Sequence, residues 1–158
     1  MEITWYGHSC FRITERGFAT VVTDPFDSAV VGYNPLKLKA EIVTVSCNDL
    51  GHNNLSAVKG DAFEITGQGE YERGGVFITG IQTTPHSQDG KALRNTLYVL
   101  DYGKLTILHL GQVNHVPSQS LIEELGNINI ALVPVGEGGA LGGCSGGKIL
   151  DMKLSRLL

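Results

Sequence analysis

The sequence lacks the features that would assign it to a membrane, secreted or nucleic-acid-binding class. None of its apolar runs approaches the roughly 20 residues that a transmembrane helix needs. No basic stretch followed by an apolar segment stands at its start, so we expect a cytoplasmic protein. It has 12 Lys and Arg against 16 Asp and Glu, without a basic cluster. We therefore expect neither nucleic acid nor a membrane as its partner.

Cysteine is scarce and glycine is abundant. The three cysteines are Cys10, Cys47 and Cys144, an odd number that does not suggest a disulfide framework. The 21 glycines follow no period and lie between apolar runs, which indicates tight turns between short strands. With 158 residues and no linker or repeat, residues 1–158 are expected to form a single domain.

Short runs of β-branched, apolar and aromatic residues predict a sheet-rich fold. The expected strands are residues 3–6, 10–14, 19–23, 42–46, 62–66, 75–81, 96–101, 105–110 and 128–135. Apolar residues at helical spacing predict helices at 117–125 and 148–158. Strands first, and then strands mixed with helices, indicate an α/β (α+β) fold in which helices cover the sheets.

Four of the five histidines lie beside predicted strand ends or in loops that contain glycine. They are His52, His86, His109 and His115. Metal and active sites are often built from strand ends that are distant in sequence. A histidine beside a strand is also commonly a packed residue with a hydrogen-bonded ring, so the position by itself leaves both interpretations open.

Several segments together resemble the metallo-β-lactamase-fold hydrolases, in particular a small branch similar to ascorbate-6-phosphate lactonases. These segments are residues 7–13 (GHSCFRI), 23–26 (TDPF), 44–46 (TVS), 67–72 (GQGEYE), 95–99 (NTLYV), 109–111 (HLG) and 133–136 (VPVG). The resemblance covers nearly the whole chain. It implies an αββα sandwich with its site at one edge of two sheets. It also implies a last strand bearing a histidine ligand, which this chain, ending at Leu158, is expected to lack.

The family's metal-binding loop reads His-x-His-x-Asp-His, whereas residues 47–52 read CNDLGH. By this resemblance, Cys47 and Asp49 stand where the family has its first two histidines. Gly51 stands where the family has the acid that binds the second metal or activates water. His52 keeps the family residue.

Two further family ligands lie later in the chain. The resemblance matches His86 to the next histidine ligand and puts Gln112 in place of a bridging aspartate. The second metal site is expected to be lost, because glycine offers no donor and an amide is a weak ligand for a dication. Thiolate, carboxylate and imidazole are competent zinc ligands, so a single zinc held by Cys47, Asp49 and His86 is the alternative to a chain without metal.

Simpler roles remain open for the same residues. Cys47 is also typical of a small buried residue at a strand end, and Asp49 of a residue that caps a turn. Residues expected around the ligands rather than on the metal are His8, Asp24, His109, Gln112 and His115.

The sequence thus predicts a relative of these hydrolases with a largely lost metal site, inactive or weakly active, and serving a binding or structural role. One alternative is a single-zinc hydrolase of a lactone or phosphoester that uses Cys47, Asp49 and His86. Another is a homo-oligomer, formed through a sheet edge that a missing last strand would expose. The small-molecule ligand is not identified by the sequence.

Overall fold

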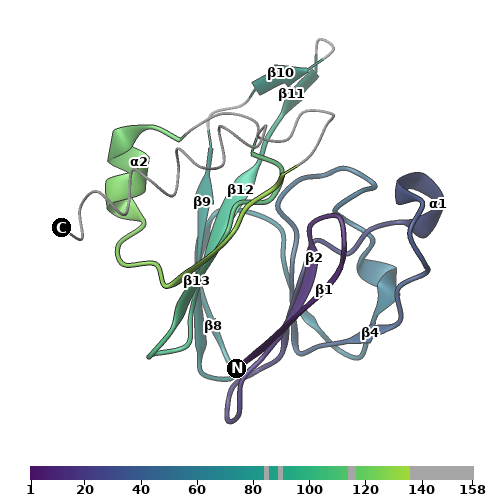
Figure 1. Ribbon diagram of the computed structural model, residues 1–158, viewed down its shortest axis with the longest axis horizontal. Helices are drawn as coiled ribbons and strands as arrows, with labels where there is room; N and C mark the ends of the chain where they lie inside the picture. The colour runs from purple at the N-terminus through teal and green to yellow at the C-terminus, as the bar shows by residue number, and fades with distance from the viewer. Residues whose placement is uncertain (84–85, 89–90, 114–116, 136–158) are drawn as a thin grey trace.

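The computed structural model describes residues 1–83, 86–88, 91–113 and 117–135, and it contains two five-stranded sheets (Figure 1). The first sheet has the order β1 (Glu2–Gly7), β2 (Cys10–Thr14), β3 (Val21–Thr23), β5 (Ile42–Thr44) and β7 (Phe63–Ile65). The second has the order β14 (Ile130–Leu132), β13 (Thr106–His109), β12 (Thr96–Asp101), β9 (Val76–Gln82) and β8 (Gly69–Arg73).

Smaller elements lie outside these sheets. Two-stranded pairs join β4 (Leu38–Lys39) to β6 (Val58–Lys59), and β10 (His86–Gln88) to β11 (Lys91–Leu93). The helices are α1 (Ser28–Val31), α2 (Gln119–Glu124) and the 3₁₀ turn η1 (Leu55–Ala57). No helix in the described part of the chain is long and apolar enough to cross a membrane.

The main core lies between the two sheets and follows from side-chain alternation along the strands. From the first sheet it takes Val21 and Ile42, and from the second Tyr98 and Leu100, all fully or almost fully buried. The Tyr98 hydroxyl also donates to the carbonyl oxygen of Val45, at 2.8 Å, and so ties the second sheet to the first.

The alternate residues of the same strands pack on the outer faces. Val22 and Val43 belong to a cluster that also contains Val31 of α1. Leu97 and Leu108 belong to a cluster that contains Leu121 of α2. Both sheets are therefore covered on both faces, as Figure 1 shows with α1 and α2 on opposite sides of the molecule, and the predicted αββα sandwich is confirmed.

The predicted strands within the described residues are present. The bounds of β2 and β12 are as predicted, β1 is longer, β9 is shifted by one residue and the others are shorter, with the strand predicted at 128–135 reduced to β14. The prediction missed β8, whose sequence GEYER is mostly polar because the strand lies at a sheet edge and is largely exposed. It also missed α1, which is only four residues long. The helix predicted at 148–158 and the expected end of the fold lie outside the described residues.

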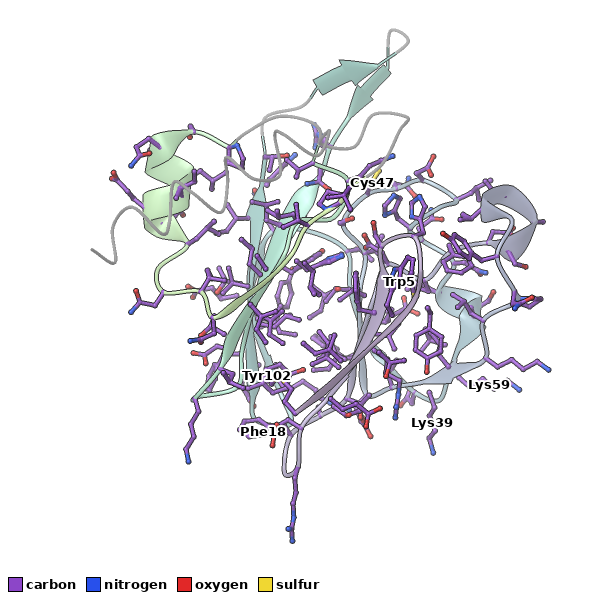
Figure 2. The ribbon with its side chains drawn as sticks, viewed as in Figure 1. Trp5, Phe18, Lys39, Cys47, Lys59 and Tyr102 are labelled. Atoms are coloured by element: carbon purple, nitrogen blue, oxygen red, sulfur yellow. The ribbon has the colours of Figure 1, made fainter. Side chains whose placement is uncertain are left out.

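Strand direction brings one end of both sheets together. Strands β3 and β5 are parallel, as are β13 and β14, so their carboxyl ends share an edge within each sheet. Asp24 follows β3, Cys47 lies three residues after β5, and His109 ends β13. In the view of Figure 2, Cys47 and Trp5 lie toward the upper end of the sheets, and Phe18 and Tyr102 at the lower end.

Candidate functional site

Asp24 is the centre of the candidate site. Its carboxylate is fully buried and accepts three hydrogen bonds. The Ser46 amide donates to Oδ1 at 2.7 Å, and the Ser46 hydroxyl donates to Oδ2 at 2.5 Å. The His52 Nδ1 atom lies 2.8 Å from the same Oδ2. A buried carboxylate is tolerated only with such partners, so these contacts fix the ends of β3 and β5 and the loop that carries His52.

The backbone at this edge is held in an uncommon conformation. Asp24 and His8 are the residues other than glycine that have positive φ in the described chain, at 40° and 51°. Left-handed backbone costs energy for a residue with a Cβ atom, although aspartate tolerates it better than most. This conformation turns the chain sharply after β3 and β1, where the side chains of Asp24 and His8 contact His52.

His109 is the second imidazole near Asp24. Its Nε2 lies 3.9 Å from Asp24 Oδ2, and its ring is almost completely buried. Burial lowers the pKa of His109, and the Asp24 charge offsets only part of this effect, so the ring is neutral at pH 7. For Asp24, burial disfavours the charged form, but His109 and the hydrogen bonds from His52 and Ser46 outweigh it and lower its pKa.

His52 and His8 lie edge to face. Their ring centroids are 4.6 Å apart, and the His52 side chain is fully buried. Burial, followed by the neighbouring His52, lowers the pKa of His8. Because His52 Nδ1 faces the Asp24 carboxylate, its proton belongs on Nδ1, and Nε2 has no hydrogen-bond partner among the described residues.

Cys47 and Gln112 meet across 65 positions of sequence. The Cys47 thiol is 3 % exposed and donates to Gln112 Oε1 at 3.3 Å. Burial, followed by the nearby Asp49 and Asp24 carboxylates, raises the pKa of Cys47 to about 11. The thiol therefore stays protonated at neutral pH, as the donor in this hydrogen bond must be.

Asn95 and Gly111 position Gln112, and sequence reasoning missed the role of both. The Gln112 amide donates to Asn95 Oδ1 at 2.8 Å, and Asn95 Nδ2 donates to the Leu110 carbonyl at 3.0 Å. Gly111 has φ 59°, and a Cβ atom there would clash with the Ser46 side chain. Asn95 and Gly111 each belong to a segment that resembles the hydrolase family, residues 95–99 and 109–111, and this resemblance is the signal that could have found them.

Asp49 lies outside these contacts. It is exposed, and its Oδ1 accepts the Gly51 amide at 2.9 Å, while its carbonyl oxygen accepts the His52 amide. This is the turn-capping role that the sequence left open for Asp49. Gly51 has no donor side chain, and a Cβ atom there would lie 3.1 Å from Asp49 Oδ1 and 3.3 Å from His8 Cε1.

The remaining candidates are only partly described. His86 begins β10, where it pairs with Leu93, but its side chain lies outside the described part, as does the whole of His115. The assignment of Cys47, Asp49, His52 and His86 as metal ligands stays a prediction. The structure joins Asp24, His52, His109 and His8 in one cluster, and Cys47 with Gln112 in a second contact.

The described residues do not fit a metal centre. No group of three His, Cys, Asp or Glu side chains among them is placed to hold a metal ion. The contacts of the donors agree, because the Cys47 thiol is hydrogen-bonded to the Gln112 amide oxygen, and the Asp49 carboxylate is engaged in its turn. We therefore derive no reaction step through a metal.

Comparison with known proteins agrees with the fold. The family profile described as "Beta-lactamase superfamily domain" matches residues 2–151. A UPF0173 metal-dependent hydrolase of Thermoplasma acidophilum is 29% identical over 163 residues, which span 86% of this chain and 71% of that protein. A second protein described in the same way, from a Chelativorans species, is 28% identical and covers 90% of this chain and 76% of that protein.

Solved structures show the same similarity. A Thermotoga maritima protein of the metallo-β-lactamase superfamily superimposes with a TM-score of 0.77 at 35% identity. The match covers 95% of this chain and 69% of that chain. A structure from Parabacteroides distasonis has a TM-score of 0.73 at 16% identity, covers 95% and 76% of the two chains, and supports the fold alone.

Proposed function

Because this chain belongs to the metallo-β-lactamase-fold family of metal-dependent hydrolases, we propose that it keeps the family's fold and pocket but binds a small molecule with little or no hydrolysis. The fold and the edge where strands deliver polar side chains are retained. The residues at that edge differ from those of the family's motif, and the proposed loss of hydrolysis follows from this difference.

One contact carries the proposal. Cys47 and Gln112, which replace a ligand histidine and a bridging aspartate by the resemblance, are hydrogen-bonded to each other. A thiol that donates and an amide oxygen that accepts satisfy one another without a metal ion. Gly51 adds to this, because the residue before His52 has no carboxylate with which to orient an attacking water.

The buried Asp24 network also supports a binding site rather than a collapsed remnant. A charged carboxylate in the interior is costly unless hydrogen-bond donors satisfy it. Asp24 has such donors and holds His52 and Ser46 at short distances. In this proposal the site keeps the contacts of Asp24 with Ser46 and His52, while the residues at the family's metal-binding positions have changed.

Metal content tests the proposal directly. We expect the protein, purified without chelator or histidine tag, to contain well under one zinc per chain by elemental mass spectrometry, also after incubation with zinc. About one zinc per chain, lost in Cys47→Ala, would contradict the proposal. It would support the single-zinc alternative with Cys47, Asp49 and His86, to be followed by lactone and phosphodiester assays.

A restored variant provides the positive control. Cys47→His, Asp49→His, Gly51→Asp and Gln112→Asp together should raise zinc affinity, because they return the donors that this edge has lost. Gly51 has no positive φ to forbid a side chain, and its close neighbour Asp49 is replaced in the same variant. The exposed Glu72→His adds a histidine on β8 and should leave zinc binding unchanged.

A further inference from the structure

A pocket of about 680 Å³ opens beside the candidate site. This volume is in the range of small-molecule sites. Its described lining includes the aromatic side chains Trp5, Phe11 and Tyr33 and the apolar side chains Leu132 and Val135. Among the described lining residues there is no Lys, Arg, Asp or Glu. The described walls therefore combine apolar and aromatic side chains with a few polar ones, and an anion would find no lysine or arginine among them.

Polar groups of the pocket come mainly from histidines. His8, His52 and His109 all line it, together with Gln112. The His52 Nε2 and His109 Nδ1 atoms are buried and have no hydrogen-bond partner among the described residues. A buried polar atom without a partner costs about 1–3 kcal/mol, so a ligand group that pairs with it gains affinity.

The state of the His52 ring determines what that group must be. Asp24 holds the proton on Nδ1, so in the neutral ring Nε2 carries a lone pair and accepts a hydrogen bond. A partner for Nε2 must therefore bring its own N–H or O–H. The Trp5 indole is not free for this purpose, because its Nε1 donates to the His8 carbonyl at 2.9 Å.

We propose that this pocket binds an uncharged, flat, largely apolar molecule whose N–H or O–H group donates a hydrogen bond to His52 Nε2. The inference rests on the proposed function, since a metal on His52 would occupy the same lone pair. Aromatic walls favour a planar ring, because face and edge contacts with Trp5 and Tyr33 add to apolar burial.

A matched set of two-ring probes tests the inference. Indole carries an N–H donor, benzofuran has an oxygen in its place, and benzofuran-2-carboxylate adds a negative charge. Trp5 is the single tryptophan of the chain and lines the pocket, so its indole N–H signal in a ¹⁵N-correlated NMR spectrum reports binding. All three probes are titrated at the same pH, so that their affinities can be compared directly.

We expect saturable shifts of the Trp5 signal with indole, and an affinity for benzofuran about tenfold lower because the hydrogen bond is lost. The carboxylate should bind more weakly than either neutral probe. The ¹⁵N shift of His52 Nε2 should respond to indole and not to benzofuran. Equal affinities for indole and benzofuran, tightest binding of the carboxylate, or no binding of any probe would each overturn the inference.

Variants locate the contact. His52→Leu should remove the preference for indole over benzofuran, and Tyr33→Ala should weaken both neutral probes alike, because it removes a wall and leaves the acceptor. Tyr33 is 46% exposed, so this second variant should still fold. The exposed Phe77→Ala, on β9 and outside the pocket lining, is the control and should change neither affinity.

The two proposals fail in different ways. One zinc per chain in the same preparation, lost on His52→Leu, would contradict the proposed function, since Nε2 would then be a metal ligand. A preparation without metal in which indole fails to bind, or shows no preference over benzofuran, leaves the proposed function standing and contradicts only the inferred ligand class.

Discussion

At the scale of single residues, Asp24 combines burial, charge and three hydrogen bonds. Asp24→Asn keeps the shape of the side chain but removes the charge and one acceptor. We expect it to lower the free energy of unfolding by about 2–4 kcal/mol, because Ser46 and His52 then lose charge-assisted partners. Urea unfolding followed by circular dichroism measures the change.

The matched control is Asp27→Asn. Asp27 caps α1 by accepting the Ala29 amide at 2.9 Å, and asparagine caps helices about as well as aspartate. This variant should stay within about 0.5 kcal/mol of the parent. Equal effects at the two positions would show that the buried network does not stabilise the fold as proposed.

The thiols of Cys10 and Cys47 make a second prediction at this scale. Burial raises the pKa of Cys10 to about 12 and that of Cys47 to about 11, so both lack the thiolate that reacts with alkylating agents. In a Cys144→Ser background, both should react with iodoacetamide at pH 8 at least about 100-fold more slowly than a free thiol. Mass spectrometry measures the modification, and full reactivity should return in urea. Rapid labelling of folded Cys47 would mean that its contact with Gln112 is not maintained.

At the scale of elements, the turn after β13 carries a steric requirement. Gly111 has φ 59°, and an added Cβ atom would clash with Ser46, which binds Asp24. Gly111→Ala should cost about 2–4 kcal/mol, from backbone strain and overpacking together. Thermal and urea unfolding check the value.

Gly103 offers a comparison with strain alone. It lies in the turn between β12 and β13 with φ 78°, and nothing lies within 4 Å of an added Cβ atom. Gly103→Ala should therefore cost only about 1 kcal/mol. Equal losses in the free energy of unfolding for the two alanine variants would show that the close packing of Gly111 on Ser46 does not add to the cost of the substitution.

At the scale of the whole molecule, acid should destabilise the fold. Burial lowers the pKa of His109, so the unfolded chain binds a proton more readily than the folded one. The contribution of His109 to the free energy of unfolding should be fully present above pH 6.5, the approximate pKa of histidine in the unfolded chain. Below that pH the free energy of unfolding should fall by up to about 1.4 kcal/mol per pH unit for one proton. Asp24, whose pKa is also lowered, adds a further loss at lower pH, because its unfolded carboxyl takes up the proton first.

Urea unfolding at several pH values tests this behaviour. His109→Gln removes the titrating ring, so its stability should depend less on pH between 7 and 5 than that of the parent chain. A parent protein that becomes more stable over that interval would contradict the assigned direction.

Self-association also belongs to the whole molecule. Among the described residues, β14 is an edge strand of the second sheet. An edge of unpaired backbone groups can pair with a second copy of the chain, so we predict a homo-oligomer formed through that edge. Size-exclusion chromatography with light scattering measures the state, and a monomer at high concentration would count against the prediction.

The sequence alone determined the layer order and the family. The apolar run at residues 42–46 predicted a covered strand, and β5 is buried. The αββα sandwich itself was implied by the resemblance of several segments to the metallo-β-lactamase-fold hydrolases. The sequence alone also shows that Gly51 has no donor atom for a metal and that Gln112 is an amide, since the chemistry of a side chain does not depend on the fold. The polar edge strand β8 was not, because an exposed strand has no apolar signature.

Only the tertiary structure decided which polar groups meet. Asp24 and His52 are 28 residues apart, and Cys47 and Gln112 are 65 apart. Their contacts depend on strand register, on the left-handed backbone of Asp24 and on the close approach of Gly111, none of which a local pattern encodes. Side-chain chemistry is a property of the sequence, but the distance between two side chains is set by packing, and the pocket beside His52 exists only through that packing.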